Sequence, residues 1–471
     1  MLKDKLYGDE INSEIRNIVQ EYTINDDING IRDEDLLFSV DDDIFLDFLL
    51  MKLRSKTISY ATMKKRKTEE EEKQLELEIR RIQTKENIVT DDINVLETKK
   101  EQLKKIREKR MEGVLLRSRA RWIAEGEKVS NYFCNLEKRH FVSKNMSRLI
   151  DRHENVLTNQ KDIIHEVQSF YKSLYEKSDV ENCEIKDLVN DIPTLTDLKA
   201  NKLEDKITLE EATRVLKMMK NNKSPGTNGF STEFFKFFWK QIGIFVVRAL
   251  NTGFQKGELS CPQREGIIVC IPKGDKPRQY IKNWRPISLL NAVYKIGSSC
   301  IASRLKTVLS DIINEDQTGF MRNRYIGDNI RLIYDTIAFL DEHNLPGMLL
   351  NIDFEKASDT IDWRFMHKVL KAFGFKTDIC NWISTFYKNI KSCVIVNGQV
   401  SNWFEIKRGC RQGDPISPYL FVLCVEILAT MVRENPNIKG ILMNNIEYKL
   451  TQYADDTEFL LAGDKKSLNP L

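Results

Sequence analysis

Met-Leu-Leu-Asn-Ile-Asp (348–353) is a short apolar run that ends in a carboxylate. Its apolar residues do not alternate with polar ones, which predicts a strand buried on both faces. Further along, Tyr-Ala-Asp-Asp (453–456) lies within a second β-rich stretch, 448–461, that predicts a hairpin with the two acids at or beside its tip. Both stretches therefore predict strand ends that present Asp353, Asp455 and Asp456 to solvent.

Carboxylates that are gathered in one place repel one another, so the usual reason for such a cluster is to bind divalent metal ions. Two metal ions can activate an attacking oxygen and stabilise a leaving one, as nucleotidyl transfer requires. These residues alone suggest a nucleic-acid polymerase or the remains of one. A carboxylate pair on a turn is also common as a solvated or capping group, so the flanking sequence has to decide.

The composition is that of a water-soluble chain with many ions. Of 471 residues, 41% are hydrophobic and 30% are charged, while the net charge is only +3. The nine cysteines form no C-x-x-C pair, which favours buried thiols in a reducing compartment over a zinc site or disulfides. No secretory core or membrane-length apolar stretch is present. We expect an intracellular protein without membrane contact, and its oligomeric state stays open.

The N-terminal part reads as helical and highly charged. Residues 1–60 predict a weakly specified helical lead-in, and about 61–112 predict one long polar helix, because no Pro or Gly occurs before Gly113. Its heptad pattern is broken, so a coiled-coil assembly module is the weakest reading. Residues 176–206 are acidic and weakly patterned, which is typical of a linker.

Basic residues are concentrated at the end of this charged region. Ten Lys or Arg residues and three Glu lie between Lys99 and Arg121. Most charged helices of this kind are solvated and carry ion pairs. The alternative is a helix that binds phosphates, favoured by the grouping of Arg117, Arg119, Arg121 and Trp122.

The stretch from Lys220 to Asp464 resembles the reverse transcriptase of LINE-type (non-LTR) retrotransposons, and it does so in blocks that follow the family order. The segment RSRARWIAEGEKVSNYFCNLEKRH (117–140) is similar to the basic segment that precedes the polymerase in these elements. The blocks are KNNKSPGTNGFSTEFFKFFW (220–239), YIKNWRPISLLNAVYKI (280–296), QTGFMRNRYIGDNI (317–330), DFEKASDTIDW (353–363), VNGQVSNWF (396–404), GCRQGDPISPYLF (409–421) and YADDT (453–457).

The resemblance implies an α+β fold: a right-hand polymerase palm and fingers, with an antiparallel palm sheet packed on helices, after a helical N-terminal extension. The domains expected are a lead-in (1–60), a charged and basic helical extension (61–200), the start of the fingers (201–252) and the reverse transcriptase domain (253–471). It also implies an RNA template, a DNA primer, deoxynucleoside triphosphates and two Mg²⁺ ions, with Mn²⁺ as an alternative.

The resemblance assigns roles to individual residues. Asp353, Asp455 and Asp456 are expected to be the catalytic metal ligands, helped by the backbone carbonyl of Phe354. Lys273 and Arg285 are expected to bind the triphosphate, although each alone would be read as a surface cation. Gln412 and Gly413 are expected to form the loop beneath the incoming nucleotide, for which an ordinary turn that opens a helix is an equally compatible reading. These residues are Asp353, Phe354, Lys273, Arg285, Gln412, Gly413, Asp455 and Asp456.

Two substitutions depart from the family pattern. Ser358 replaces an aromatic residue that normally excludes ribonucleotides by packing at the sugar 2′ position, which predicts weaker sugar discrimination. Asn228 replaces the usual Asp of another block. The family's thumb and endonuclease have no counterpart in this sequence, so a truncated copy is expected. An inactive relic that keeps only metal and RNA binding is the alternative function.

Overall fold

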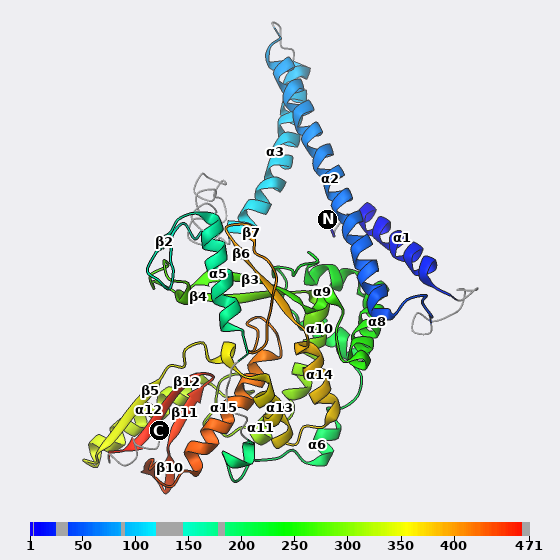
Figure 1. Ribbon diagram of the computed structural model, residues 1–471. Coiled ribbons are helices and arrows are strands. Elements are labelled where there is room, and N and C mark those ends of the chain that lie inside the picture. Colours follow the sequence, from blue (N-terminus) through cyan, green and yellow to red (C-terminus); the bar gives the residue numbers. More distant parts are fainter. Residues whose placement is uncertain (3, 25–35, 86–89, 119–144, 178–183, 464–471) are drawn as a thin grey trace.

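The computed structural model describes residues 1–2, 4–24, 36–85, 90–118, 145–177 and 184–463, with the backbone only for 90 and 110–118 (Figure 1). Helices and mostly antiparallel strands are mixed along this chain, which confirms the α+β class. In these ranges no helix has both the length and the apolar character needed to cross a membrane.

The chain begins with three helices, α1 (Lys5–Tyr22), α2 (Asp42–Gln83) and α3 (Thr90–Ser118). Helices α2 and α3 contact each other and project from the body as a hairpin (Figure 1). The prediction of one helix over 61–112 was therefore wrong, because α2 ends at Gln83 without a Gly or Pro to mark the break. The missed signal is the acidic first turn of α3, where Asp91 and Asp92 complement the helix dipole.

Ion pairs join the two arms of this hairpin. Lys99 on α3 pairs with Glu78 on α2, and Arg107 pairs with Glu76 and Glu72 at 2.6 and 3.4 Å. Ile79 is a buried apolar residue of α2 in this region. For Lys99 and Arg107, the structure confirms the reading of a solvated helix with ion pairs.

The first turns of α2 belong to the main core and are not a weakly specified lead-in. The ring of Phe45 packs edge-on against Phe245 of helix α8 (Thr232–Lys256), with ring centroids 5.3 Å apart. Beside it, Asp42 pairs with Arg248 of α8 at 2.6 Å. The N-terminal helices are thus anchored to the body through α8.

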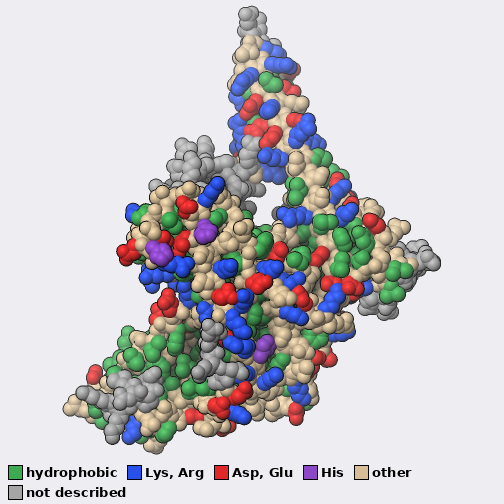
Figure 2. Space-filling view, in the orientation of Figure 1, with side chains coloured by type: hydrophobic (Ala, Val, Ile, Leu, Met, Phe, Trp, Pro, Cys, Tyr) green, Lys and Arg blue, Asp and Glu red, His purple; other side chains and the backbone are tan. Residues whose placement is uncertain are grey.

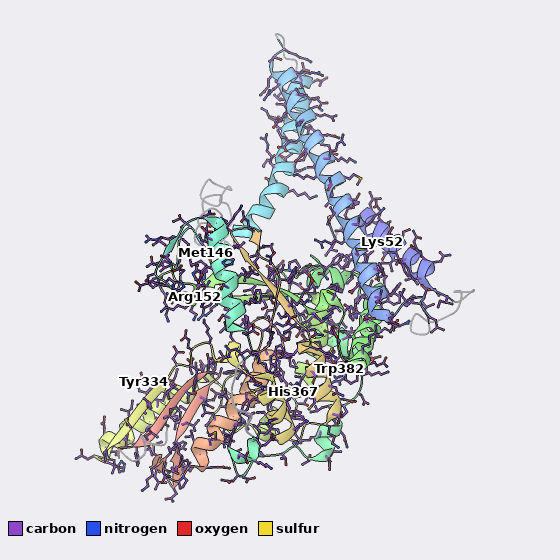
Figure 3. All side chains as sticks on the ribbon, viewed as in Figure 1. Lys52, Met146, Arg152, Tyr334, His367 and Trp382 are labelled. Carbon is purple, nitrogen blue, oxygen red and sulfur yellow. The ribbon has the colours of Figure 1, made fainter. Side chains whose placement is uncertain are left out.

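Helix α8 lies within a layer of helices that includes α7 (Leu209–Met218), α10 (Ala292–Leu305) and α14 (Thr377–Tyr387). Phe235 and Phe238 of α8 are fully buried, and Trp382 of α14 (labelled in Figure 3) stacks on Phe254 of α8 at 4.4 Å between centroids. The aromatic residues of α8 are therefore mainly core. Phe237 is the exception, because half of its surface is exposed.

Thr208-Leu-Glu-Glu211 has the Thr-x-x-Glu spacing that predicts a capping box, and helix α7 starts at this Thr. Thr208 accepts a hydrogen bond from the backbone N–H of Glu211. The carboxylate of Glu211 does not fold back to complete a capping box, because it accepts two hydrogen bonds from the Arg304 guanidinium, at 2.9 and 2.7 Å. Arg304 also donates to the carbonyl oxygens of residues 203–206, so it fastens this loop to α10.

Two sheets lie on either side of the cleft described below. The larger one has the order β4-β3-β6-β7, with β8 paired to β6, and its β3–β6 pair is parallel. The other is antiparallel, in the order β11-β12-β5. The strands are β3 (Glu265–Pro272), β4 (Trp284–Leu290), β5 (Gly347–Ile352), β6 (Lys391–Val396), β7 (Gln399–Val400), β8 (Phe404–Glu405), β11 (Leu450–Tyr453) and β12 (Asp456–Ala462).

The prediction that 348–353 is buried on both faces was wrong. Strand β5 is an edge strand that pairs with β12 alone, and its residues alternate between exposed and half-buried. Met348, Leu350 and Ile352 pack against the small core under this sheet, while Leu349 points away and is exposed. An apolar run does not reveal whether its second face has a covering layer.

Other local features can be read from adjacent residues: the sequence predicts a helix from Asp362 to Gly374 and a hairpin with an Asn397–Gly398 turn, and both are present. Asp362 caps helix α13 (Trp363–Ala372), which ends before Gly374 at a φ of +81°. The turn between β6 and β7 uses Asn397 and Gly398, both with positive φ, as a two-residue hairpin requires. The described part of the expected linker is not free, because Ile185, Val189 and Leu203 are buried in the core.

The remaining elements complete the chain in sequence order. They are β1 (Leu149–Ile150), β2 (Val156–Leu157), α5 (Gln160–Leu174), η1 (Ile185–Asp187), α6 (Asp197–Asn201), α9 (Cys261–Arg264), η2 (Ile281–Asn283), α11 (Leu309–Ile312), α12 (Ile326–Glu342), η3 (Ala357–Thr360), α15 (Ser417–Glu434), β9 (Ile441–Met443) and β10 (Ile446–Tyr448). Five of the seven described cysteines are buried and all seven are free thiols, as predicted.

Candidate active site

The three acidic residues meet where β5 and β12 end. Thr457 of β12 pairs with Ile352 of β5, so continuing this register places Asp456 opposite Asp353. Asp455 lies in the turn between β11 and β12. Partial burial, followed by the charges of Asp455 and Asp353, raises the pKa of Asp456 above its ordinary value. The structure therefore brings the predicted carboxylates into electrostatic contact.

The turn that carries these acids is held by Gln317, a fully buried residue that sequence reasoning did not single out. Its side-chain oxygen accepts hydrogen bonds from the backbone N–H groups of Ala454 and Gly319, at 2.9 and 2.8 Å. Its amide nitrogen donates to the Ala454 carbonyl at 3.2 Å. A Cβ on Gly319 would lie 2.2 Å from the nitrogen of Ala454, so only glycine permits this approach.

The acids share a cleft of about 640 Å³ with basic side chains. Lys273 follows β3, and its N–H donates to the Asn283 carbonyl at 2.8 Å. The proline after Arg285 predicts that this arginine lies in a turn, but Arg285 is exposed within β4, paired with Ile271. Lys276, Lys282 and Lys356 line the cleft too, and sequence reasoning missed them. Figure 2 shows Lys and Arg side chains gathered around β4, on the side that faces the β5–β12 sheet.

The loop of Gln412 and Gly413 lies beside this cleft, which Gln412 lines. The carbonyl of Gln412 accepts a hydrogen bond from the N–H of Ser288 in β4 at 2.7 Å. Gly413 has a φ of +111°, and a Cβ there would lie 2.7 Å from the Ser288 carbonyl oxygen. The loop does open α15, as the simple reading held, but it is also fitted closely against β4, where a side chain at 413 has no room.

Ser358 lies where this cleft meets a second, smaller cavity of about 170 Å³. Ser358, Gln412 and Asp455 line both spaces. The backbone of Ser358 is fixed, because its carbonyl accepts a hydrogen bond from the N–H of Cys410 at 2.7 Å. A larger side chain at position 358 would thus project toward the junction of the two cavities.

Phe354 is half-buried and lines the cleft next to Asp353. Of the predicted phosphate-binding arginines, Arg119 and Arg121 lie outside the described residues, and Arg117 lies in α3 without a described side chain. Asn228 caps its own turn by accepting from the N–H of Phe230 at 3.1 Å.

Divalent metal is the group that the acidic cluster suggests, and the donors present suit it in type. Hard cations prefer carboxylate oxygens, and the mutual repulsion that raises the pKa of Asp456 is what a cation relieves. The donors are not drawn together around one point: across the described ranges, no set of three His, Cys, Asp or Glu side chains is arranged to hold a metal ion.

Comparison with known proteins identifies the family to which this region is similar. Residues 271–470 match the family model described as reverse transcriptase (RNA-dependent DNA polymerase). The chain is 32% identical over 368 residues to the transposon TX1 uncharacterized 149 kDa protein of Xenopus laevis, which covers 78% of this chain and 28% of that protein. It is 26% identical over 216 residues to a Pol polyprotein from retrotransposable element R2 of Popillia japonica, covering 46% of this chain and 30% of that protein.

A third relative is the RNA-directed DNA polymerase from mobile element jockey of Drosophila funebris, 23% identical over 261 residues, or 54% of this chain and 27% of that protein. The chain thus spans less than a third of the length of these three relatives. The matched region contains every acidic and basic residue that we assigned to the cleft. The chain carries a reverse transcriptase domain of the non-LTR retrotransposon family.

Proposed function

We propose that the chain catalyses RNA-directed DNA synthesis, adding deoxynucleotides to a primer 3′-hydroxyl opposite an RNA template. The observation that supports this most directly is the cleft in which an acidic edge faces a basic one. A nucleoside triphosphate has the complementary character, since its phosphates need cations and its reacting centre needs metal-binding carboxylates. In the right-hand description of a polymerase, β5, β11 and β12 with α13 and α15 would form the palm, and β3 with β4 would belong to the fingers.

Asp353, Asp455 and Asp456 would hold the two Mg²⁺ ions, or Mn²⁺ in their place, with the carbonyl of Phe354 as a further donor. When bound, such ions supply Lewis acidity at the primer oxygen and at the leaving pyrophosphate. The protein's own contribution is to fix the acid-bearing turn through Gln317 and to keep the two strand ends in register. The backbone thus holds the three carboxylates at neighbouring strand ends, from which their side chains could reach a common ion.

Lys273 and Arg285 would bind the triphosphate from the opposite wall. Each projects from the β3–β4 pair, and no ion pair of either side chain occurs among the described residues, so both are available to an anion. Arginine suits phosphate because its planar group donates two parallel hydrogen bonds. Gln412 and Gly413 would form the loop that supports the nucleotide from below, and the glycine lets this loop pack closely on the Ser288 carbonyl of β4.

The test is primer extension by the full chain on an RNA template with Mg²⁺, and then with Mn²⁺, beside an Asp455→Ala variant. Asp335→Ala, which removes an exposed acid on α12 away from the cleft, is the matched control. We expect extension by the wild type and the control, and its loss in Asp455→Ala. Extension that survives in Asp455→Ala, or none by the wild type with either ion, would contradict the proposal.

A further inference from the structure

Helix α5 precedes the region that matches the reverse transcriptase model, yet its C-terminal end lies against the cleft. It crosses the larger sheet beside β6 (Figure 1). Tyr175 is the residue that caps α5. Its carbonyl oxygen accepts a hydrogen bond from the N–H of Lys407 at 2.9 Å. The carbonyl oxygen of Leu174, one residue earlier, accepts a hydrogen bond from Nε of Arg408 at 2.8 Å. The helix end is thus tied to the segment that leads into the Gln412–Gly413 loop.

The Tyr175 side chain continues this connection into the site. Its hydroxyl donates to Oδ1 of Asp359 at 2.9 Å, and Gln412 donates from Nε2 to Oδ2 of the same carboxylate at 3.0 Å. Tyr175 and Asp359 are 2% and 1% exposed, so water does not compete for these bonds. The two hydrogen bonds form a chain from the end of α5, through buried Asp359, to Gln412 in the lining of the cleft.

This chain determines which way the Gln412 amide points. Burial raises the pKa of Asp359 to about 6, with Tyr175, Lys356, Gln412 and Lys273 opposing that rise, so near pH 8 the group is a carboxylate that only accepts hydrogen bonds. The NH₂ group of Gln412 must therefore face Asp359. Its Oε1 is left facing the other way, and within the described ranges this oxygen accepts no hydrogen bond.

We propose that Tyr175, acting through Asp359, is a positioning residue that orients the Gln412 amide so that its oxygen accepts a hydrogen bond from the sugar hydroxyl of the bound deoxynucleotide. The inference rests on the proposed function, since it assumes that the cleft binds nucleotides. An oriented carbonyl oxygen selects a donor, and the sugar donor of a deoxynucleoside triphosphate is its 3′-hydroxyl. If the Tyr175 bond is lost, Asp359 and the amide can reorient, and this selection weakens.

Helix α5 has a second contact with the cleft. The Nζ of Lys356, which lines the cleft, lies 3.9 Å from the centroid of the Phe170 ring on α5. A cation held over an aromatic face is attracted by the ring's electrons. The helix therefore contacts the lining at both Lys356 and Asp359, which agrees with a positioning role for α5.

The test is binding of a fluorescent 2′-deoxyadenosine triphosphate and of its 3′-deoxy analogue, with Ca²⁺ so that no chemistry occurs, to the full chain. Tyr175→Phe removes only the donating hydroxyl. Tyr171→Phe is the matched control, because it removes a buried hydroxyl from the same helix that contacts the sulfur of Cys270, at 3.7 Å, and not Asp359.

We expect Tyr175→Phe to weaken binding of the 3′-hydroxyl nucleotide about tenfold, as the loss of one charge-assisted hydrogen bond implies, and to leave the 3′-deoxy analogue nearly unchanged. In a Gln412→Ala background, Tyr175→Phe should add nothing. The inference would be overturned if Tyr175→Phe weakened the binding of both nucleotides equally or left the binding of both unchanged. It would also be overturned if Tyr171→Phe lost the same affinity, or if the wild type bound neither nucleotide. A wild type that binds nucleotide with the expected selectivity but extends no primer would contradict the proposed function alone.

Discussion

Glu426, on α15 below the β5–β11–β12 sheet, should make the protein less stable as pH rises. Its side chain is only 1% exposed. Oε1 of Glu426 accepts a hydrogen bond from the Arg433 guanidinium, while Oε2 has no hydrogen-bond partner among the described residues. Burial, with a contribution from Asp316, raises the pKa of Glu426 from 4.5 to about 7. Because the folded state holds this proton more tightly than the unfolded state, the stability is fully present below pH 4.5 and is lost as pH rises through 7.

The size of the effect follows from the shift. A rise of roughly 2.5 pKa units at 1.36 kcal/mol per unit amounts to about 3 kcal/mol of stability lost between pH 4.5 and 8. Glu426→Gln mimics the protonated form and keeps an oxygen for Arg433. The variant should match the wild type near pH 4.5 and exceed it by up to about 3 kcal/mol at pH 8.

The assay is urea unfolding of both proteins, followed by tryptophan fluorescence, at pH steps from 4.5 to 8. Other buried acids titrate too, since burial raises the pKa values of Asp47 and Asp359 to about 6. The difference between variant and wild type removes their contribution, because both proteins contain them. A difference that does not change with pH, or a variant that is less stable at pH 8, would refute the reasoning.

Three further predictions concern the cleft and its support. Ser358→Phe should lower the ratio of ribonucleotide to deoxynucleotide incorporation, because the ring would project into the junction of the two cavities; an unchanged ratio in primer extension contradicts this. Gly413→Ala should lower the free energy of unfolding by about 1–3 kcal/mol in urea titrations, more than Gly257→Ala, which shares a positive φ but meets no atom within 4 Å. Arg304→Lys should cost about 1.5–3 kcal/mol in the same assay, because lysine cannot reproduce the paired bonds to Glu211; a loss below 0.5 kcal/mol argues against it.

The sequence was sufficient to predict the local parts of the site. Strand ends, the Asn397–Gly398 turn and the Asp362 cap each depend on a few adjacent residues, and the structure has all of them as predicted. The exposure of β5 was not predictable, because it depends on which element covers its second face. The fold-back of α3 on α2 was missed because a polar helix without Gly or Pro carries a weak stop signal.

Contacts between segments that are distant in the sequence could not be predicted, for a different reason. Tyr175 and Asp359 are 184 residues apart, and Gln317 and Ala454 are 137 apart. A buried tyrosine is usually a core residue, and a Gln in a polar loop is usually solvated. No periodicity or spacing distinguishes these two from others of their kind, so their roles emerge only when the fold places a partner within hydrogen-bond reach.

Gln317 and Tyr175 also show how the rigidity of this site is divided. Gln317 makes three hydrogen bonds to backbone groups around the acid-bearing turn, so the positions of the strand ends are fixed. The carboxylates of Asp455 and Asp456 are exposed, so their side chains stay free to rotate. Binding of a cation should then require changes of side-chain rotamer and not of backbone, which costs little conformational free energy. Gln412, in contrast, is fixed at both its backbone and its side chain, as a residue that must discriminate between ligands by hydrogen-bond direction needs to be.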